Sequence, residues 1–394
     1  MEKKIRFATA VPDFSKKRGG AERYLVDLCA QMVDHGFEVH VYAEHWSEEA
    51  SGIHYHRVKA LSLSKGFRLL SFALRATKEI TRGNYDVTLG VGNTLRADVL
   101  QPHGGVHWAW FWRSLAAYDH PVLWTVKFLG RMLSPKQWVS GWIEDAPYKG
   151  KSYAKIVAIS DMVKQDIIRW YGVPEDRIVV VYNGVDIARF HPRNRQYREE
   201  IRRRHGIADE FVMLFVSNNF RMKGLSYLIK ALARIKKENH PPFKLLILGR
   251  GRQDPYLRLA HKMGVSEEVI FAGSTDEPEK YYGAADLLVH PTFYDAFSLT
   301  VLEALASGLP VITTSFAGAS GIINLREAGF VISDPRNDKM LAQQIVFFSD
   351  PKVREKALIA ARSLAEHYSL DEHCSRMRAI FQKNCEKDLL EEGG

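Results

Sequence analysis

The chain has 394 residues, a formal net charge of +9 at pH 7 and three cysteines. This length exceeds what one hydrophobic core usually supports, so two domains are expected. Cys29, Cys374 and Cys385 show no Cys-x-x-Cys spacing and leave an odd thiol, which argues against a disulfide framework and favours the reducing cytoplasm. No apolar stretch approaches the roughly 18 residues of a membrane-spanning helix, and no signal peptide is expected.

The positive charge favours phosphorylated or membrane-bound partners, although it can equally serve solubility. Nucleic acid is not predicted, because the chain lacks zinc-finger Cys/His spacing and the ring-rich glycine motif of RNA-binding sheets. Gly249-Arg-Gly251 has only the first two glycines of a dinucleotide fingerprint, and the chain has no P-loop or Gly-x-Ser-x-Gly motif. Dehydrogenase, kinase and hydrolase functions therefore lose their main support.

Apolar runs separated by helical patterns follow the chain in two series. The first series predicts a helix from Gly19-Gly20 to about Asp34 and strands at 5–11, 39–42, 85–91 and 155–159. The second series predicts strands at 211–217, 243–248, 269–272, 286–290, 310–314 and 330–333. Both predict an α/β fold of doubly wound parallel sheets. A linker is expected at 186–204, so we predict domains at 1–188 and 205–368.

Asp295 and Glu303 lie on either side of the start of a predicted helix in the second series. The preceding apolar run at 287–290 predicts a buried strand, so Asp295 is expected at its carboxyl end. Glu303 lies about one helical turn further in, where it could accept hydrogen bonds from a ribose. The helix start would offer phosphate the backbone N–H groups of Phe297, Ser298, Leu299 and Thr300. These features predict a nucleotide-sugar site, the alternative being an acidic loop and an ordinary helix.

Loops after the first strand of each series carry further candidates. Gly19 and Gly20 allow close approach of the backbone, and the helix that they open offers amides to an anion. Arg221 and Lys223 occupy the corresponding loop of the second series, where a guanidinium and an ammonium could neutralise a diphosphate leaving group. The alternative for the two glycines is a tight turn beneath the basic residues 16–18. The alternative for Arg221 and Lys223 is that they are solvated loop charges.

His103 follows a predicted strand and precedes two glycines, so it could contact a ligand at the carboxyl edge of the first sheet. A structural histidine is the alternative. With His107 it forms one His-x3-His pair, too few ligands to predict zinc. The chain contains no Asp-x-Asp. We therefore expect metal-independent chemistry without a cofactor.

An insertion at 106–143 is rich in tryptophan and other large apolar side chains, interrupted by Arg113, Lys127, Arg131 and Lys136. This composition is typical of a membrane interface. A second basic stretch at 57–82 would suit anionic lipid headgroups or a phosphorylated glycolipid. The alternative is that the aromatic side chains pack on the first domain. An anionic membrane surface is therefore an expected partner.

The Asp295-x7-Glu303 pattern resembles the Glu-x7-Glu signature of the retaining family 4 glycosyltransferases of GT-B fold, with Asp in the first position. The resemblance assigns donor-sugar contact to Asp295 and ribose contact to Glu303. Lys223 matches the lysine of the family's Gly-Arg-Leu-x3-Lys-Gly loop, but Arg221 stands two residues before the lysine instead of five. Asn183-Gly-Val-Asp186 matches the family's inter-domain junction, whereas Gly318-Ala-Ser-Gly321 lacks its usual acidic residue.

The family implies two Rossmann-like domains facing across a cleft, with a carboxyl-terminal helix, 369–394, that packs back on the first domain. Gly19 and Gly20 would lie beside the donor diphosphate, and His103 would contact the donor sugar. The implied reaction moves a hexose, with glucose preferred, from a nucleoside diphosphate sugar such as UDP-glucose to a glycolipid or lipopolysaccharide-core acceptor. The enzyme would act peripherally on the inner face of the cell membrane. A nucleotide-sugar epimerase and a non-catalytic glycan or nucleotide-sugar binding module remain the alternatives.

Overall fold

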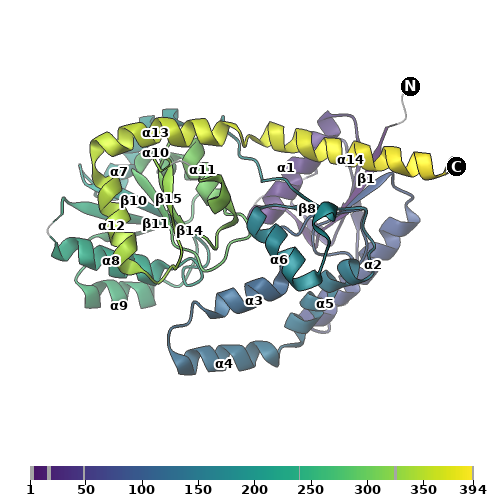
Figure 1. Cartoon of the computed structure of the whole chain (residues 1–394), viewed down its shortest axis with the longest axis horizontal. Coiled ribbons are helices and arrows are strands. Elements are labelled where there is room, and N and C mark those ends of the chain that lie inside the picture. The colour runs from purple at the N-terminus through teal and green to yellow at the C-terminus, as the bar shows by residue number, and fades with distance from the viewer. Residues whose placement is uncertain (1–3, 16–18, 48, 239, 324–325, 393–394) are drawn as a thin grey trace. The chain divides into compact units, whose positions relative to one another are not determined.

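The computed structural model describes residues 4–15, 19–47, 49–238, 240–323 and 326–392, and side chains up to residue 385 (Figure 1). The chain forms two compact units. Unit 1 comprises Met1–Tyr182 and His373–Gly394, and unit 2 comprises Asn183–Glu372. None of the described helices is both long enough and apolar enough to span a membrane.

Unit 1 contains a parallel sheet of seven described strands in the order β5-β3-β1-β6-β7-β8-β9. In that order the strands are β5 (Ile53–Arg57), β3 (Glu38–Ala43), β1 (Arg6–Ala10), β6 (Val87–Gly90), β7 (Val99–Leu100), β8 (Lys155–Ala158) and β9 (Ile178–Val180). A separate parallel pair is formed by β2 (Asp13–Phe14) and β4 (His45–Trp46).

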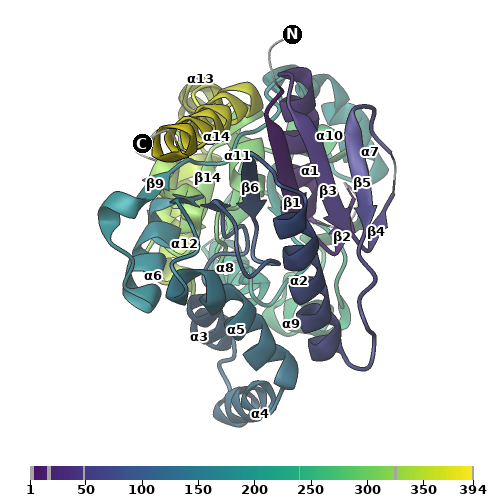
Figure 2. The same ribbon diagram turned by 90° about the vertical axis from the view of Figure 1, so that its right-hand side faces the viewer.

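The described helices of unit 1 are α1 (Gly20–Asp34), α2 (Lys65–Arg82), α3 (His107–Leu115), α4 (Pro121–Met132), α5 (Pro135–Lys149), α6 (Asp161–Tyr171), the 3-10 turn η1 (Glu175–Arg177) and α14 (Leu370–Glu392). Helix α2 lies along β1 and β3 (Figure 2). Its apolar face buries Phe72, Ala76 and Ile80 against Ala8 and Tyr42 of these strands. Burial of this face fixes α2 on one side of the sheet.

Unit 2 contains a parallel sheet of six described strands in the order β12-β11-β10-β13-β14-β15. In chain order the elements are η2 (Pro192–Tyr197), α7 (Arg198–Arg204), β10 (Phe211–Val216), α8 (Leu225–Lys237), β11 (Phe243–Leu248), α9 (Asp254–Met263), β12 (Val269–Gly273), α10 (Pro278–Ala284), β13 (Leu287–His290), α11 (Leu299–Ala306), β14 (Val311–Thr314), η3 (Gly318–Ile322), β15 (Gly329–Ile332), α12 (Asp338–Ser349) and α13 (Pro351–Glu366).

The strands of unit 2 are apolar along their length because helices cover both faces of the sheet. Met213, Phe215 and Leu245 are almost fully buried in one core together with residues of α8 and α12. Each predicted strand of the second series is present, so the α/β prediction of two Rossmann-like domains is confirmed. The strand expected before His103 is β7, whereas β5 and β9 were not predicted, because β5 is rich in histidine and β9 is very short.

The carboxyl-terminal helix α14 packs on unit 1, as predicted. Phe381 contacts Phe7 of β1 with ring centroids 5.1 Å apart. At the start of the helix, Nε2 of His373 lies 2.7 Å from the hydroxyl of Tyr24, and Nδ1 lies 2.7 Å from the carbonyl of Tyr182. These contacts tie both ends of the unit-1 sequence together.

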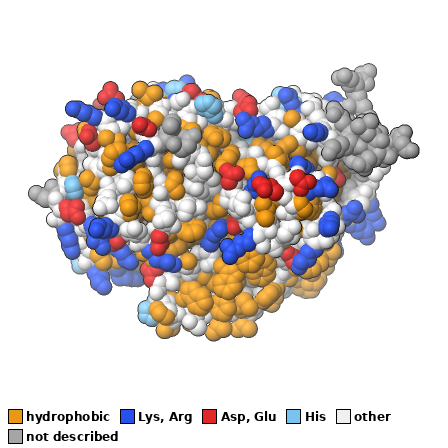
Figure 3. Space-filling view, viewed as in Figure 1, with side chains coloured by type: hydrophobic (Ala, Val, Ile, Leu, Met, Phe, Trp, Pro, Cys, Tyr) orange, Lys and Arg blue, Asp and Glu red, His pale blue; other side chains and the backbone are white. Residues whose placement is uncertain are grey.

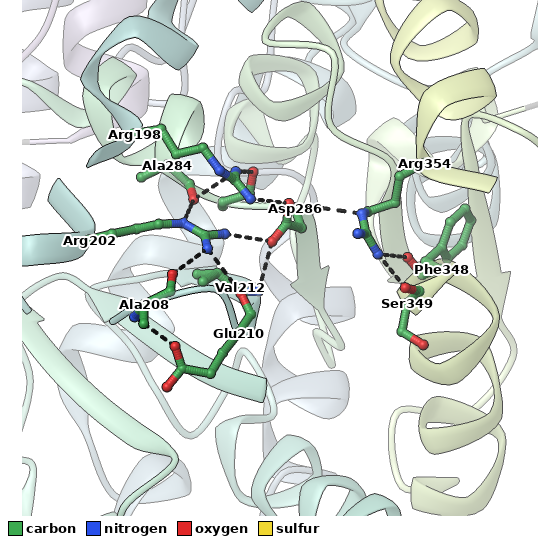
Figure 4. Close-up of polar contacts among 11 residues, drawn as sticks. Arg198, Arg202, Ala208, Glu210, Val212, Ala284, Asp286, Phe348, Ser349 and Arg354 are labelled. Carbon is green, nitrogen blue, oxygen red and sulfur yellow. Dashed lines mark hydrogen bonds and ion pairs between the residues drawn. The ribbon is translucent and has the colours of Figure 1, made fainter. Parts of the chain in front are cut away.

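The segment at 186–204, predicted as a linker, packs instead within unit 2. Its attachment point is Asp286, which lies just before β13 and is almost fully buried (Figure 4). Arg198 and Arg202 bind its two carboxylate oxygens at 2.7 and 2.8 Å, and the amide of Val212 donates to the same carboxylate at 2.9 Å. A third guanidinium, that of Arg354 on α13, lies 3.9 Å away. One buried anion thus joins α7, β10, β13 and α13.

Candidate functional site

The candidate site of unit 2 is built by the loops that follow two adjacent parallel strands, β10 and β13. Because both strands run in the same direction, both loops leave from the same edge of the sheet. The amide of Phe293 donates to the carbonyl of Met222 at 2.8 Å, which joins the two loops. Gly224 has a φ of +76°, and a Cβ there would lie 2.1 Å from the carbonyl oxygen of Pro291. Glycine is therefore required for the close approach.

Lys223 and Asp295, one from each loop, form an ion pair with 2.5 Å between Nζ and Oδ2. The ammonium also donates to the carbonyl of Tyr294 at 3.1 Å. His290, at the end of β13, places its Nε2 3.2 Å from the same carboxylate oxygen of Asp295. The sequence prediction thus named two of these three partners, and the structure brings them together.

These contacts set the charges of the site. Burial alone would raise the pKa of Asp295, but the Lys223 ammonium and the His290 hydrogen bond outweigh it and hold that pKa well below its usual range. Burial lowers the pKa of His290, and the nearby ammonium lowers it further. At neutral pH the site therefore contains a carboxylate, an ammonium and a neutral imidazole. We assign the His290 proton to Nε2, because this atom faces the carboxylate.

The amino end of α11 presents buried polar groups beside this cluster. Ser298, the residue before the helix, has φ 78° and ψ 73°, a left-handed conformation that is rare for a residue with a side chain. The hydroxyl oxygens of Ser298 and Thr300 are buried and have no hydrogen-bond partner among the described residues. The carbonyl of Phe297 accepts from Ala319 at 2.6 Å, which fixes the loop. Strain and unpartnered hydroxyls at one helix start are typical of a ligand site.

Glu303 lies one turn further along α11. Its carboxylate accepts a hydrogen bond of 2.8 Å from the hydroxyl of Tyr282 on α10, and Tyr282 is fully buried. The tyrosine therefore orients the carboxylate predicted to contact a ribose. Leu299 and Thr300 occupy the first turn, where helix geometry leaves backbone N–H groups without partners inside the helix. Arg221 lies in the same loop as Lys223 with an exposed side chain.

Gly19 and Gly20 lie at the start of α1 in unit 1. Gly19 precedes the helix with φ −164°, an extended conformation, and its carbonyl accepts from the amide of Arg23 at 3.0 Å. Gly20 is exposed as the first helical residue. The basic residues 16–18 that precede them lie outside the described residues. The glycines thus form an open helix start, and their role beside a diphosphate stays a prediction.

His103 follows β7, as predicted, and its ring packs on Tyr24 of α1 with centroids 3.9 Å apart. Burial lowers its pKa to about 3, with a smaller contribution from His373, so the ring is neutral at pH 7. Its Nε2 is buried and has no hydrogen-bond partner among the described residues. Such an atom normally costs stability, so an unpartnered nitrogen in this loop is consistent with ligand contact.

Two residues of the unit-2 site were not predicted. His290 was assigned only to a buried strand, although a histidine that ends an apolar run five residues before Asp295 was an available signal. Tyr282 lies 21 residues before Glu303, and nothing in the local sequence pattern connects them. Each contacts a residue that was predicted: His290 contacts Asp295, and Tyr282 contacts Glu303. Only the tertiary structure brings such pairs together.

Two family models match the chain. Residues 18–189 match Glycosyltransferase Family 4, and residues 197–363 match Glycosyl transferases group 1. The lipopolysaccharide glucosyltransferase WaaG of Escherichia coli is 25% identical over 82% of this chain and 84% of its own length. The glycosyltransferase MJ1607 of Methanocaldococcus jannaschii is 32% identical, but the match spans only 55% of this chain and 57% of that protein.

Solved structures show the same fold. The WaaG crystal structure aligns with a TM-score of 0.79 at 23% identity. The alignment covers 95% of this chain and 99% of the WaaG chain. Anabaena HepE, solved in complex with UDP-glucose, has a TM-score of 0.69 at 18% identity, with 96% and 100% covered. Two Rossmann-like units, each matched by a glycosyltransferase family model, establish that this chain belongs to the family 4 glycosyltransferases of GT-B fold.

Proposed function

We propose that the protein transfers a hexose, with glucose preferred, from a nucleoside diphosphate sugar to a membrane-associated glycolipid or lipopolysaccharide-core acceptor, with retention at the anomeric carbon. The observation that carries this proposal is the Lys223–Asp295–His290 cluster beside the strained start of α11. It places the Lys223 ammonium, the Asp295 carboxylate, which can accept hydrogen bonds from sugar hydroxyls, and the first-turn amides of α11 in one site. UDP-glucose is the preferred donor, supported by the likeness in fold to HepE, which was solved with that compound.

The leaving diphosphate would be stabilised by Lys223 and by the first-turn amides of α11, from Ser298 to Thr300. Negative charge grows on this group as the glycosidic bond breaks, so these contacts strengthen toward the transition state. Arg221 would add a second cation from the same loop. Metal-independent chemistry is proposed because these groups can neutralise a diphosphate without a bound ion.

The donor sugar would be held through its hydroxyls. Asp295 stays ionised and can accept hydrogen bonds from them, while His290 and Lys223 fix its orientation. Glu303, oriented by Tyr282, would accept from the ribose hydroxyls. In unit 1, His103 would contact the sugar, and the open start of α1 at Gly19 and Gly20 would approach the diphosphate.

The membrane part of the proposal is carried by α4. None of its residues is buried in the structure, although its sequence is predominantly apolar. Its outward side chains, 49–62% exposed, are Val122, Leu123, Val126 and Leu129. Figure 3 shows apolar side chains gathered over α3 and α4. An exposed apolar face of this kind favours an interface with another phase or molecule.

Charge on the surrounding elements favours an anionic membrane as the occupant of this face. Lys127 and Lys136 are exposed on α4 and α5. The second basic stretch contributes the exposed side chains of Lys59, Lys65, Arg68, Arg75 and Lys78. Each basic residue near an anionic surface contributes about 1 kcal/mol to the free energy of membrane binding. The proposed location is therefore the inner face of the cell membrane.

The structure separates packed from exposed aromatic side chains in the insertion. Trp108 contacts Phe111 and Trp138, with centroids 5.7 and 5.4 Å apart. Trp110 lies under the guanidinium of Arg131 at 5.0 Å. We therefore propose that Trp108 and Trp110 pack within the insertion, whereas the exposed apolar side chains of α4 meet the membrane.

Replacing Val122, Leu123, Val126 and Leu129 together by Ser should weaken sedimentation with anionic vesicles at least tenfold. The substitutions remove apolar surface that would enter the lipid, but they disturb no buried contact, so the melting temperature should stay nearly unchanged. Binding of the unaltered protein should also weaken with salt.

The matched control for this variant replaces Leu257 and Ile359, exposed apolar residues of unit 2, by Ser. It should sediment like the unaltered protein. If the α4 variant also sediments normally, or the unaltered protein ignores vesicles at low salt, the membrane assignment is wrong.

Glu303→Ala should weaken binding of free UDP by about 1 to 3 kcal/mol, because the ribose hydroxyls lose their charged acceptor. Isothermal titration calorimetry measures this loss directly. Tyr282→Phe is the control, since it removes the internal hydrogen bond but keeps the carboxylate, and it should cost less. Equal losses in the two variants would indicate that Glu303 serves packing alone.

A panel of nucleoside diphosphate sugars tests the donor assignment. Calorimetry should show binding of a nucleoside diphosphate sugar in the presence of a chelator. Formation of an epimerised sugar in the absence of acceptor would favour the epimerase alternative. Binding without any turnover in the presence of lipopolysaccharide-core acceptors would favour a non-catalytic module. The segment Gly318–Gly321, which lacks the family's usual acidic residue, is the reason for testing this alternative.

Activity abolished by chelation and restored by manganese would contradict metal independence.

A further inference from the structure

Three histidines and a glutamate gather on strands β3 and β5 of unit 1, at one edge of the sheet. The parallel register pairs His40 with His54 and Tyr42 with His56. Because side chains two residues apart in a strand share a face, Glu38, His40, His54 and His56 lie on one side of the sheet. The cluster therefore follows directly from the sequences Glu-Val-His and His-Tyr-His on neighbouring strands.

The side chains of this cluster are close and ordered. Nε2 of His40 lies 2.8 Å from Oε1 of Glu38, and Nδ1 of His40 lies 2.9 Å from Nε2 of His56. The ring of His54 stacks on that of His40 with centroids 4.7 Å apart. One ligand atom from each of Glu38, His40 and His54 lies within 4.8 Å of the others. Backbone pairing holds all three on rigid strands.

Each member of the cluster offers an atom that a transition metal can bind. Glu38 offers a carboxylate oxygen, and His40 and His54 each offer a ring nitrogen. His56 contacts the other nitrogen of His40 and so fixes the orientation of that ring.

We propose that Glu38, His40 and His54 form a binding site for a divalent transition metal, with Zn²⁺ the best match. Two imidazoles and one carboxylate are a common ligand set for zinc, and the exposed side of His54 leaves room for water as a fourth ligand. His56 would orient the His40 ring through its hydrogen bond, and Arg6, 3.2 Å from Glu38, would orient the carboxylate.

This site is separate from the groups proposed to act on the donor. Glu38 begins β3, so it lies at the amino end of that strand. His103 and Gly19 come after the carboxyl ends of β7 and β1. In a parallel sheet, this is the opposite end of the strands from Glu38. The metal would therefore stabilise unit 1, and turnover should not require it.

Titration of chelator-treated, untagged protein with Zn²⁺ tests the site. We expect one equivalent to bind, with a rise in melting temperature, because a ligand that binds only the folded state stabilises it. Co²⁺ should give a visible absorption band from the same site. Binding should weaken as the pH falls, because protons compete with the metal for the ligand atoms.

His54→Ala is the informative variant, because this side chain is exposed and its removal should leave the fold intact. It should weaken Zn²⁺ binding about tenfold or more, with unchanged circular dichroism and unchanged donor turnover. His261→Ala, an exposed histidine of α9, is the matched control and should bind like the unaltered protein. Absence of stoichiometric binding, or the same affinity in His54→Ala, would overturn the proposal.

Discussion

Lys223→Ala should lower the turnover number about 100- to 1,000-fold while weakening donor binding less than about tenfold. The ammonium is held 2.5 Å from Asp295 and would face the leaving diphosphate, where negative charge develops during the reaction. An interaction that strengthens toward the transition state affects the rate more than ground-state affinity. Steady-state kinetics and donor calorimetry on the same variant separate the two effects.

The control for this prediction is Lys262→Ala, which removes an exposed lysine of α9 and should leave both quantities unchanged. A further readout is the pH profile. Lys223 holds the pKa of Asp295 low, so without it burial should raise that pKa and move the acid limb of the profile to higher pH. Equal losses in turnover and donor affinity, with no change in the profile, would contradict the assigned role.

Asp286→Ala should destabilise unit 2 by about 3 to 5 kcal/mol. The substitution removes the carboxylate that Arg198, Arg202 and the amide of Val212 share, and it leaves the buried Arg202 guanidinium without its anion. An unpaired buried charge is among the costliest defects in a folded protein. Denaturant unfolding, followed by probes in each unit because the chain has two, measures the loss.

Glu200→Ala provides the comparison for Asp286. It removes an exposed ion pair with Arg204 one helical turn away, and should change stability by only a few tenths of a kcal/mol. If Asp286→Ala costs less than about 1 kcal/mol, the arginine cluster does not anchor the 186–204 segment in unit 2.

Local pattern was sufficient to predict most strands of both sheets and to select candidate site residues in two loops. Asp295, Glu303 and Lys223 were identified because each lies at a fixed distance from a strand or helix boundary that hydrophobic periodicity reveals. The pairing of Lys223 with Asp295 joins residues 72 positions apart, and periodicity carries no information on such pairs. The same limit explains why His290 and Tyr282 were missed.

The 186–204 segment illustrates a different limit. Its arginines and polar residues have the composition of a solvated linker, and this interpretation is wrong because Asp286, 84 residues after Arg202, supplies a buried anion. Helix α4 shows the converse. Its sequence is apolar on several sides, so the sequence could not decide which side chains face outward. Only the exposure of Val122, Leu123, Val126 and Leu129 in the structure identifies the bare face.

Transfer of labelled glucose from UDP-glucose to a truncated lipopolysaccharide-core glycolipid, in the presence of a chelator, tests whether the protein is a retaining, metal-independent glucosyltransferase. We expect a glycolipid product whose new linkage keeps the α configuration of the donor, as read by nuclear magnetic resonance. Lys223→Ala should form this product far more slowly. Failure of the unaltered protein to transfer sugar from any nucleoside diphosphate sugar, or a product of inverted configuration, would contradict it.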